Sequence, residues 1–242
     1  MTAPADAAPK VALLLTRPRA ASQRTAEILQ ACQGYDPICI SPLMDIQPTG
    51  RHPDMRNISA VVFSSANAVA QIKGQPLPAW CVGDGTAAAA RARGWHAISA
   101  AGDARALRQR IIRDAPAGRL VYLRGEKSRG DLGKHLQAAG IAVQEHIVYR
   151  QRLCGLNRQA LALLSREQAV LVPLYSPETA RQFADQLLQH GPSQAHITCV
   201  AISPAVAAKL AYLPRVRCLC ADAPSGAAML TALRHAQSTM TP

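Results

Sequence analysis

A strand-to-helix segment occurs twice in this chain, at a fixed offset of 107 residues. VALLLTRPRA, which contains Arg17, matches RLVYLRGEKS, which contains Arg124. After a one-residue adjustment, the glycine that closes the following helix also aligns, Gly34 in the first copy and Gly140 in the second. A duplicated unit of this kind predicts two similar α/β halves, and a cleft between two halves is a natural place for a ligand.

A second pair of segments repeats as well. AVVFSSANAV, residues 60–69, resembles VLVPLYSPETA, residues 170–180: each is an apolar run that ends in an aromatic residue and a serine and then opens a helix. Strands and helices alternate along the rest of the chain, and this alternation requires parallel sheets with right-handed crossovers. The sequence therefore predicts an α/β protein with two doubly wound, flavodoxin-like parallel-sheet domains.

The position of the repeats predicts how the chain is divided. We expect a discontinuous first domain, 1–37 plus 152–242, and a second domain, 47–142. The extended segments 38–46 and 143–151 would join them as a two-stranded connector. Pro173 falls inside a predicted strand, where it would be tolerated at an edge or a bulge.

Composition and charge limit the function. The chain has 242 residues, 49% of them hydrophobic, and no segment that reads as a signal peptide or a membrane span, so we expect a cytoplasmic protein without a membrane partner. Seven scattered cysteines without a C-x-x-C pair, and dispersed histidines, predict no metal and no cofactor. The formal net charge of +12 would attract polyanions, but with 4% aromatic residues and no recognition motif we expect no nucleic acid.

Candidate binding residues stand where the predicted strands end, because ligands of parallel α/β sheets bind beyond the carboxyl ends of strands. Small hydroxyl residues and glycines there leave helix N-terminal amides free for carboxylates, although the same residues also cap helices in any α/β protein. The candidates are Arg17, Ser64, Ser65, Asn67, Gly83, Thr86, Arg124, Gly125, Ser176, Pro177, Glu178 and Ser203. Arg17 and Arg124 suit charge-assisted bonds to carboxylates, or alternatively salt bridges within the protein.

Taken in order, these motifs resemble the uroporphyrinogen-III synthase family of the tetrapyrrole pathway. The resemblance covers nearly the whole chain and includes LLLTRP, FSSANAV, VGDGTAAAARARG, YLRGE, VYR, LYSPETA, CVAISPAVAA and APSGAAML. It implies two flavodoxin-like domains with a cofactor-free cleft between them. It also implies cyclisation of the polycarboxylate hydroxymethylbilane, with inversion of its last pyrrole ring, by a protein that we expect to be monomeric.

The same resemblance implies roles for two residues. Tyr149 matches the family tyrosine that points into the cleft, where its phenol could donate a proton toward the departing hydroxyl. Thr86, the second catalytic candidate, matches the family threonine of the first glycine-threonine-alanine loop, which faces the cleft. In the corresponding loop of the other half, Ser203 stands where glycine is common and Val206 where threonine is common. A non-catalytic binder of a small polyanion, and a nucleic-acid-binding module, are the alternatives.

Overall fold

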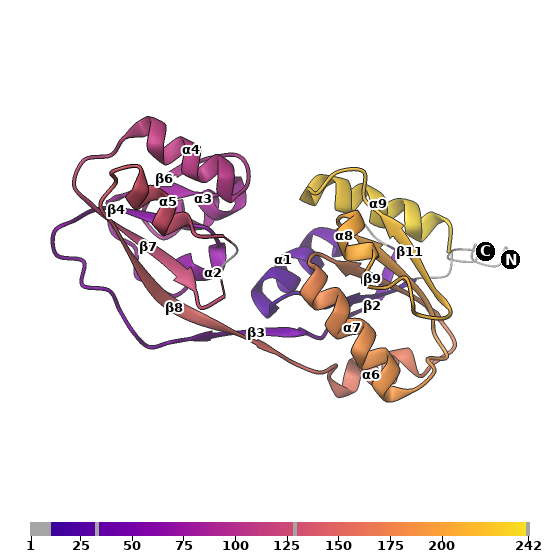
Figure 1. Cartoon of the computed structure of the whole chain (residues 1–242). Coiled ribbons are helices and arrows are strands. Elements are labelled where there is room, and N and C mark those ends of the chain that lie inside the picture. The colour runs from indigo at the N-terminus through magenta and orange to yellow at the C-terminus, as the bar shows by residue number, and fades with distance from the viewer. Residues whose placement is uncertain (1–10, 32–33, 128–129, 241–242) are drawn as a thin grey trace, which may run out of the picture. The chain divides into compact units, whose positions relative to one another are not determined.

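A computed structural model of the protein describes residues 11–31, 34–127 and 130–240. The expectation about a signal peptide concerns the first ten residues and lies outside these ranges. Packing divides the chain into two compact units: unit 1, Met1–Asp45 with Leu153–Pro242, and unit 2, Ile46–Arg152. The chain therefore begins in unit 1, forms all of unit 2 and then returns to unit 1 (Figure 1).

Unit 1 contains a parallel sheet in the strand order β11-β10-β9-β1-β2. Its strands are β1 (Val11–Leu15), β2 (Tyr35–Ile40), β9 (Ala169–Leu174), β10 (His196–Ala201) and β11 (Val216–Cys220). Its helices are α1 (Arg19–Gln30), α6 (Arg158–Leu164), α7 (Pro177–His190), α8 (Pro204–Ala207) and α9 (Gly226–Ser238). Counted in chain order within the unit, the strands lie in the flavodoxin-like order 2-1-3-4-5.

Unit 2 contains a sheet in the order β3-β8-β7-β4-β5-β6. Its strands are β4 (Ile58–Phe63), β5 (Pro78–Cys81), β6 (His96–Ser99), β7 (Arg119–Gly125) and β8 (Val143–Leu153), with β3 (Met44–Pro48) beside β8. Its helices are α2 (Ala66–Val69), α3 (Asp84–Arg91), α4 (Ala104–Asp114) and α5 (Leu132–Ala138). The pairs from β4 to β8 are parallel.

The two sheets are circular permutations of one another. Unit 2 reads β8-β7-β4-β5-β6 where unit 1 reads β2-β1-β9-β10-β11. The strands that correspond, β7 with β1 and β4 with β9, are those that the two sequence repeats pair. The repeated glycines also agree, because Gly34 and Gly140 both have a positive φ, +109° and +80°, which favours glycine. The predicted fold class, two doubly wound α/β sheets, is confirmed.

Helices cover both faces of each sheet because the strand residues alternate between two cores (Figure 1). In unit 1, Ala12 and Leu14 pack with residues of α6, α7 and α8, while Val11, Leu13 and Leu15 pack with residues of α1 and α9. In unit 2 the corresponding cores involve α2 and α3 on one face and α4 and α5 on the other. The inner strands, such as β1, β4 and β9, are therefore buried on both faces, as their continuous apolar sequences indicate.

The expected connector segments belong largely to the sheets. Residues 38–40 form the end of β2, which pairs with β1, and the extended segment 38–46 is interrupted around Pro42, which has no N–H to donate. Residues 143–149 pair along β7 as the first part of the long strand β8. The chain passes from one unit to the other within β3, between Asp45 and Ile46, and at the end of β8, between Arg152 and Leu153.

Pro173 lies in β9, which is an inner strand of its sheet and not an edge strand. The pairing of β9 with β1 covers Ala12↔Val170 and Leu13↔Leu171 and stops before Pro173. The missing N–H of Pro173 therefore breaks no ladder bond between these two strands.

Two searches of the described residues were negative. None of the helices formed by residues 11–31, 34–127 and 130–240 is long and apolar enough to cross a bilayer. Nor do three or more histidine, cysteine, aspartate or glutamate side chains of these residues converge in a way that could hold a metal ion.

Candidate functional site

Each sheet has one place where the chain reverses its direction of winding. In unit 1 the order of strands runs from β1 to β2 on one side and from β9 to β10 on the other, so the switch lies between β1 and β9. In unit 2 the switch lies between β7 and β4 for the same reason. Open α/β sheets bind ligands beyond the carboxyl ends of the strands at such a switch point. The predicted site residues fall into two sets, one for each of these edges.

The unit 2 edge contains the predicted serines after β4. Ser65 is the N-cap of α2, and its side chain accepts a hydrogen bond from the backbone N–H of Asn67 at 3.1 Å. Ser64 does not cap the helix; its hydroxyl lies 2.7 Å from the hydroxyl of Tyr122, on β7. These two serines therefore have different partners although they are adjacent in the sequence.

Tyr149 lies over Gly125 at the same edge. The two residues face each other in the register of β7 and β8, and a Cβ on Gly125 would stand 2.6 Å from Cζ of Tyr149. Since real Cβ atoms do not approach so closely, only glycine leaves room for this ring. The phenol group hydrogen-bonds with Ser65 and Asn67, and Tyr149 is 4% exposed.

The environment of Tyr149 keeps its phenol protonated. Burial raises the pKa of Tyr149 above its ordinary value of 10, and the hydrogen bonds from Ser65 and Asn67 offset only part of this rise. Burial likewise raises the pKa of Tyr122, against the opposing effect of its hydrogen bond with Ser64. At neutral pH Tyr149 is therefore an O–H donor and not a phenolate base.

Arg124, at the end of β7, is held by neighbouring groups of unit 2. Its Nε donates to Oε2 of Glu145 at 2.6 Å, and its Nη1 donates to the carbonyl oxygens of Gly125 at 2.9 Å and Glu126 at 3.1 Å. The Arg124 side chain is 18% exposed. Through these hydrogen bonds, Arg124 holds the backbone at Gly125 and Glu126 in place.

Gly83 and Thr86 follow β5, the neighbour of β4. Gly83 is the N-cap of α3 in an extended conformation, and its carbonyl accepts hydrogen bonds from the N–H groups of Thr86, at 3.1 Å, and Ala87, at 3.0 Å. Thr86 is 8% exposed, in the first turn of α3. Both residues thus lie at the same edge of the sheet as Ser64, Ser65 and Tyr149.

The unit 1 edge contains Arg17 after β1 and the Ser176 segment after β9. The guanidinium carbon of Arg17 lies 4.2 Å from the centroid of the Tyr175 ring, a cation–π contact. Ser176 caps α7 by accepting from the N–H of Thr179 at 3.2 Å, Pro177 is the first helical residue, and Glu178 stands in the first turn. These residues form a well-capped helix start directly beside Arg17.

The corresponding loop after β10 departs from the pattern. Ser203 is the N-cap position of α8 but makes no side-chain capping bond, and Val206 is 1% exposed in the core of unit 1. The residue that stands where the family has a threonine is thus a core residue here. It offers no hydroxyl at this edge.

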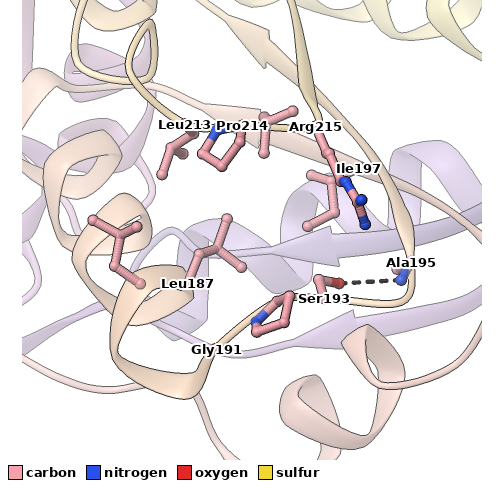
Figure 2. Close-up of a pocket in the computed structure, with 11 residues that line it drawn as sticks. Leu187, Gly191, Ser193, Ala195, Ile197, Leu213, Pro214 and Arg215 are labelled. Carbon is pink, nitrogen blue, oxygen red and sulfur yellow. Dashed lines mark hydrogen bonds between the residues drawn. The ribbon is translucent and has the colours of Figure 1, made fainter.

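One apolar cavity lies away from these edges. It has a volume of about 500 Å³ and is lined mainly by apolar side chains, among them Leu187, Ile197 and Leu213 (Figure 2). Ile197 and Val216, which also lines it, are near the amino ends of β10 and β11, and Leu187 is near the end of α7. Since ligands of doubly wound sheets bind at the carboxyl ends, this cavity is not our candidate site.

Three residues of these edges were not among the sequence candidates: Tyr122, Glu145 and Tyr175. Tyr122 precedes Arg124 by two residues, which places both side chains on one face of β7. Tyr175 immediately precedes Ser176, in the aromatic-serine pattern of the second repeat. Glu145 carries no local signal, because its role depends on the register of β8 against β7.

The fold is that of a doubly wound α/β protein, and its two carboxyl edges are the places where sheets of this class bind ligands. A family model, Uroporphyrinogen-III synthase HemD, matches residues 23–231. The chain therefore belongs to the uroporphyrinogen-III synthase family, cyclising lyases of tetrapyrrole biosynthesis whose substrate is hydroxymethylbilane. Family membership does not favour the alternative function considered above, a non-catalytic binder of a small polyanion.

A solved structure agrees with this fold. The uroporphyrinogen-III synthetase from Helicobacter pylori 26695 is similar over 94% of this chain and 100% of its own, with 17% sequence identity and a TM-score of 0.64. A mutant uroporphyrinogen III synthase from the extremely thermophilic bacterium Thermus thermophilus matches 95% of this chain and 99% of its own, with 14% identity and a TM-score of 0.48. The search of curated proteins found no match.

Proposed function

We propose that this protein converts hydroxymethylbilane to uroporphyrinogen III and that Tyr149 is its catalytic acid. The observation that carries the assignment of Tyr149 is its setting: a buried phenol at the switch-point edge of unit 2, packed on Gly125 and hydrogen-bonded with Ser65 and Asn67. The reaction eliminates water, formed from the hydroxyl of the hydroxymethyl group and a pyrrole N–H proton, to give an azafulvene. A phenol that is protonated at neutral pH can donate a hydrogen bond or a proton to the departing hydroxyl.

The second part of the proposal concerns the groups that bind the substrate carboxylates. Hydroxymethylbilane carries several carboxylates, and the edges of the two sheets offer Arg17 together with the helix starts after Gly83 and Ser176. Backbone N–H groups at a helix N-terminus and a guanidinium both favour anions. Because the linear substrate also cyclises unaided to the type I isomer, the protein's main task is to hold a folded geometry in which the substituted carbon of the terminal ring attacks the azafulvene.

The individual residue roles are part of this proposal. We assign substrate binding to Arg17, Ser64, Ser65, Asn67, Gly83, Arg124, Gly125, Ser176, Pro177, Glu178 and Ser203, and a catalytic role, beside Tyr149, to Thr86. Val206 in place of a threonine supports a smaller contribution from the loop after β10. We also propose that the protein works as a monomer in the cytoplasm, without nucleic acid and without an added cofactor.

The isomer ratio of the product tests the activity. Purified protein, treated with a chelator and given no cofactor, is incubated with hydroxymethylbilane; the products are oxidised to porphyrins and separated. We expect the type III isomer in excess over the protein-free control, and an apparent affinity that weakens at high salt because ions screen a polycarboxylate from basic groups. An isomer mixture equal to that of the control would reject the enzyme proposal and favour a ligand-binding protein.

A further inference from the structure

Arg17 and Arg124 are equivalent residues with different partners. They occupy the same place in the repeat, at the ends of the corresponding strands β1 and β7. Arg124 forms an ion pair with Glu145. Arg17 lies on the ring of Tyr175, and no carboxylate of the described residues forms an ion pair with it.

The strand registers explain why Arg17 lacks an acid. Glu145 faces Tyr122 in the pairing of β8 with β7. The repeat places Tyr122 on Leu15, and Leu15 faces Ile40 in the pairing of β2 with β1. Unit 1 therefore has an isoleucine where unit 2 has the glutamate that holds its arginine.

The two partners leave different parts of the guanidinium available. A guanidinium donates all of its hydrogen bonds in its own plane, whereas an aromatic ring contacts its face. Glu145 and two carbonyl oxygens use the Nε and Nη1 donors of Arg124. The Tyr175 ring contacts the face of the Arg17 guanidinium and the Tyr175 hydroxyl accepts a hydrogen bond from it, so the remaining donors of Arg17 are available for a carboxylate.

Tyr175 is well suited to serve as a fixed platform. It packs against the core formed by β1, β9, α1 and α9, and it directly precedes the N-cap Ser176. Its hydroxyl interacts with Arg17 and with Thr25, a residue of α1. The ring is thus anchored from below by the core and along the chain by the start of α7.

We infer that Tyr175 is a positioning residue that holds Arg17 as the carboxylate receptor of unit 1, whereas Glu145 and two carbonyl oxygens hold Arg124 to the loop around Gly125. This division of roles rests on the proposed function, because the carboxylate that Arg17 receives is one of those on hydroxymethylbilane. It makes Arg17 a specificity residue for a carboxylated substrate.

Steady-state kinetics and a direct binding measurement test the inference. KM and kcat are measured for Arg17→Gln, Arg17→Lys, Tyr175→Phe and Tyr175→Leu, and for the pair Arg17→Gln with Tyr175→Leu. Uroporphyrin III, a polycarboxylate, serves as a binding probe by fluorescence titration, so that affinity is read without turnover. Exposed residues of the same types provide matched controls, Arg19→Gln and Tyr212→Leu.

We expect Arg17→Gln to raise KM and the probe dissociation constant about 10-fold or more, as for the loss of hydrogen bonds to a charged group. Tyr175→Leu should raise both about threefold to fivefold with little change in kcat, whereas Tyr175→Phe, which keeps the ring, should stay within about twofold. In the double variant the Tyr175 change should add nothing further, because its effect acts through Arg17.

Two results would overturn the inference: an unchanged KM in both Arg17 variants, or a Tyr175→Phe variant as impaired as Tyr175→Leu. Arg17→Lys keeps the positive charge, so its KM and its probe dissociation constant can be compared with those of the unaltered protein even where Arg17→Gln folds poorly. Failure of the proposed function itself is a separate outcome, since the unaltered protein would then give no excess of the type III isomer in any condition.

Discussion

Replacement of Gly125 by alanine should displace Tyr149 and lower kcat. The new Cβ would stand 2.6, 2.7 and 2.8 Å from Cζ, Cε2 and the hydroxyl oxygen of Tyr149, and ordinary contact begins at 3.4 Å. The hydroxyl end of the ring must therefore move by about 0.8 Å, the difference between 3.4 and 2.6 Å. A shift of about 1 Å in a catalytic group costs up to about 100-fold in rate.

The same substitution has a cost in stability that can be separated from the rate. Overpacking of this kind typically lowers the free energy of unfolding by about 1–3 kcal/mol. Urea melts would measure this loss, and kcat and the isomer ratio would be measured at a temperature where the variant remains folded. Gly226→Ala is the matched control, because a Cβ at Gly226 meets no atom within 4 Å.

We expect Gly125→Ala to lower kcat about 10-fold to 100-fold and to increase the share of the type I isomer, while Gly226→Ala retains the unaltered kcat. A Gly125→Ala variant that is destabilised but keeps full kcat and full isomer fidelity would refute the reasoning. In that case the contact of Gly125 with Tyr149 would serve packing alone.

Three further predictions concern the same edge. Tyr149→Phe should lower kcat more than it lowers the melting temperature, because the ring keeps its packing while the donor is lost; an unchanged kcat and isomer ratio would exclude Tyr149 as the acid. Tyr122, Tyr149 and Tyr175 have raised pKa values in the folded state, so the folded protein holds these protons more tightly than the unfolded chain and should lose stability as the pH rises above 10. Absorbance titration at alkaline pH should show them ionising late, and together with unfolding; early, reversible ionisation of all the tyrosines would contradict this. Glu145→Gln should destabilise unit 2 by about 1 kcal/mol, since it removes the charge that holds Arg124, and a melting temperature equal to that of the unaltered protein would show that the ion pair contributes nothing.

The architecture could be predicted from the sequence because it depends on local patterns, namely the alternation of strands and helices and the two repeats. The repeats at Arg17 and Arg124, and at the two serine-containing segments, correctly indicated two similar halves, and the permuted strand orders follow from the same correspondence. The connector was harder to predict, because an extended segment looks alike whether it pairs within a sheet or lies outside one. β8 shows this: its first residues pair with β7, and its end carries the chain back to unit 1.

The site was predictable only as a set of strand ends. Loop position and residue type identified Ser65 and Ser176, both of which cap helices as the sequence allowed. The contacts that distinguish one arginine from the other depend on residues far apart in the chain, such as Arg17 with Tyr175. Such contacts arise from strand register and packing, which residue patterns do not specify.

One substitution should give Arg17 a carboxylate partner like the one that Arg124 has. Ile40 occupies in unit 1 the register position that Glu145 occupies in unit 2. Ile40→Glu should therefore supply Arg17 with a carboxylate of its own and withdraw it from the substrate. A half-exposed ion pair contributes about 1 kcal/mol, so we expect KM to rise about fivefold. Ile40→Gln, which introduces a side chain of the same size without the charge, is the control.

Salt gives this experiment a second readout. If the introduced carboxylate competes with the substrate for Arg17, ions that screen the new pair should narrow the difference in KM between Ile40→Glu and Ile40→Gln. A loss of packing at this position would instead affect both variants alike at every salt concentration. Equal KM values for the two variants at low salt would contradict the competition and, with it, the argument that the missing acid is what leaves Arg17 available.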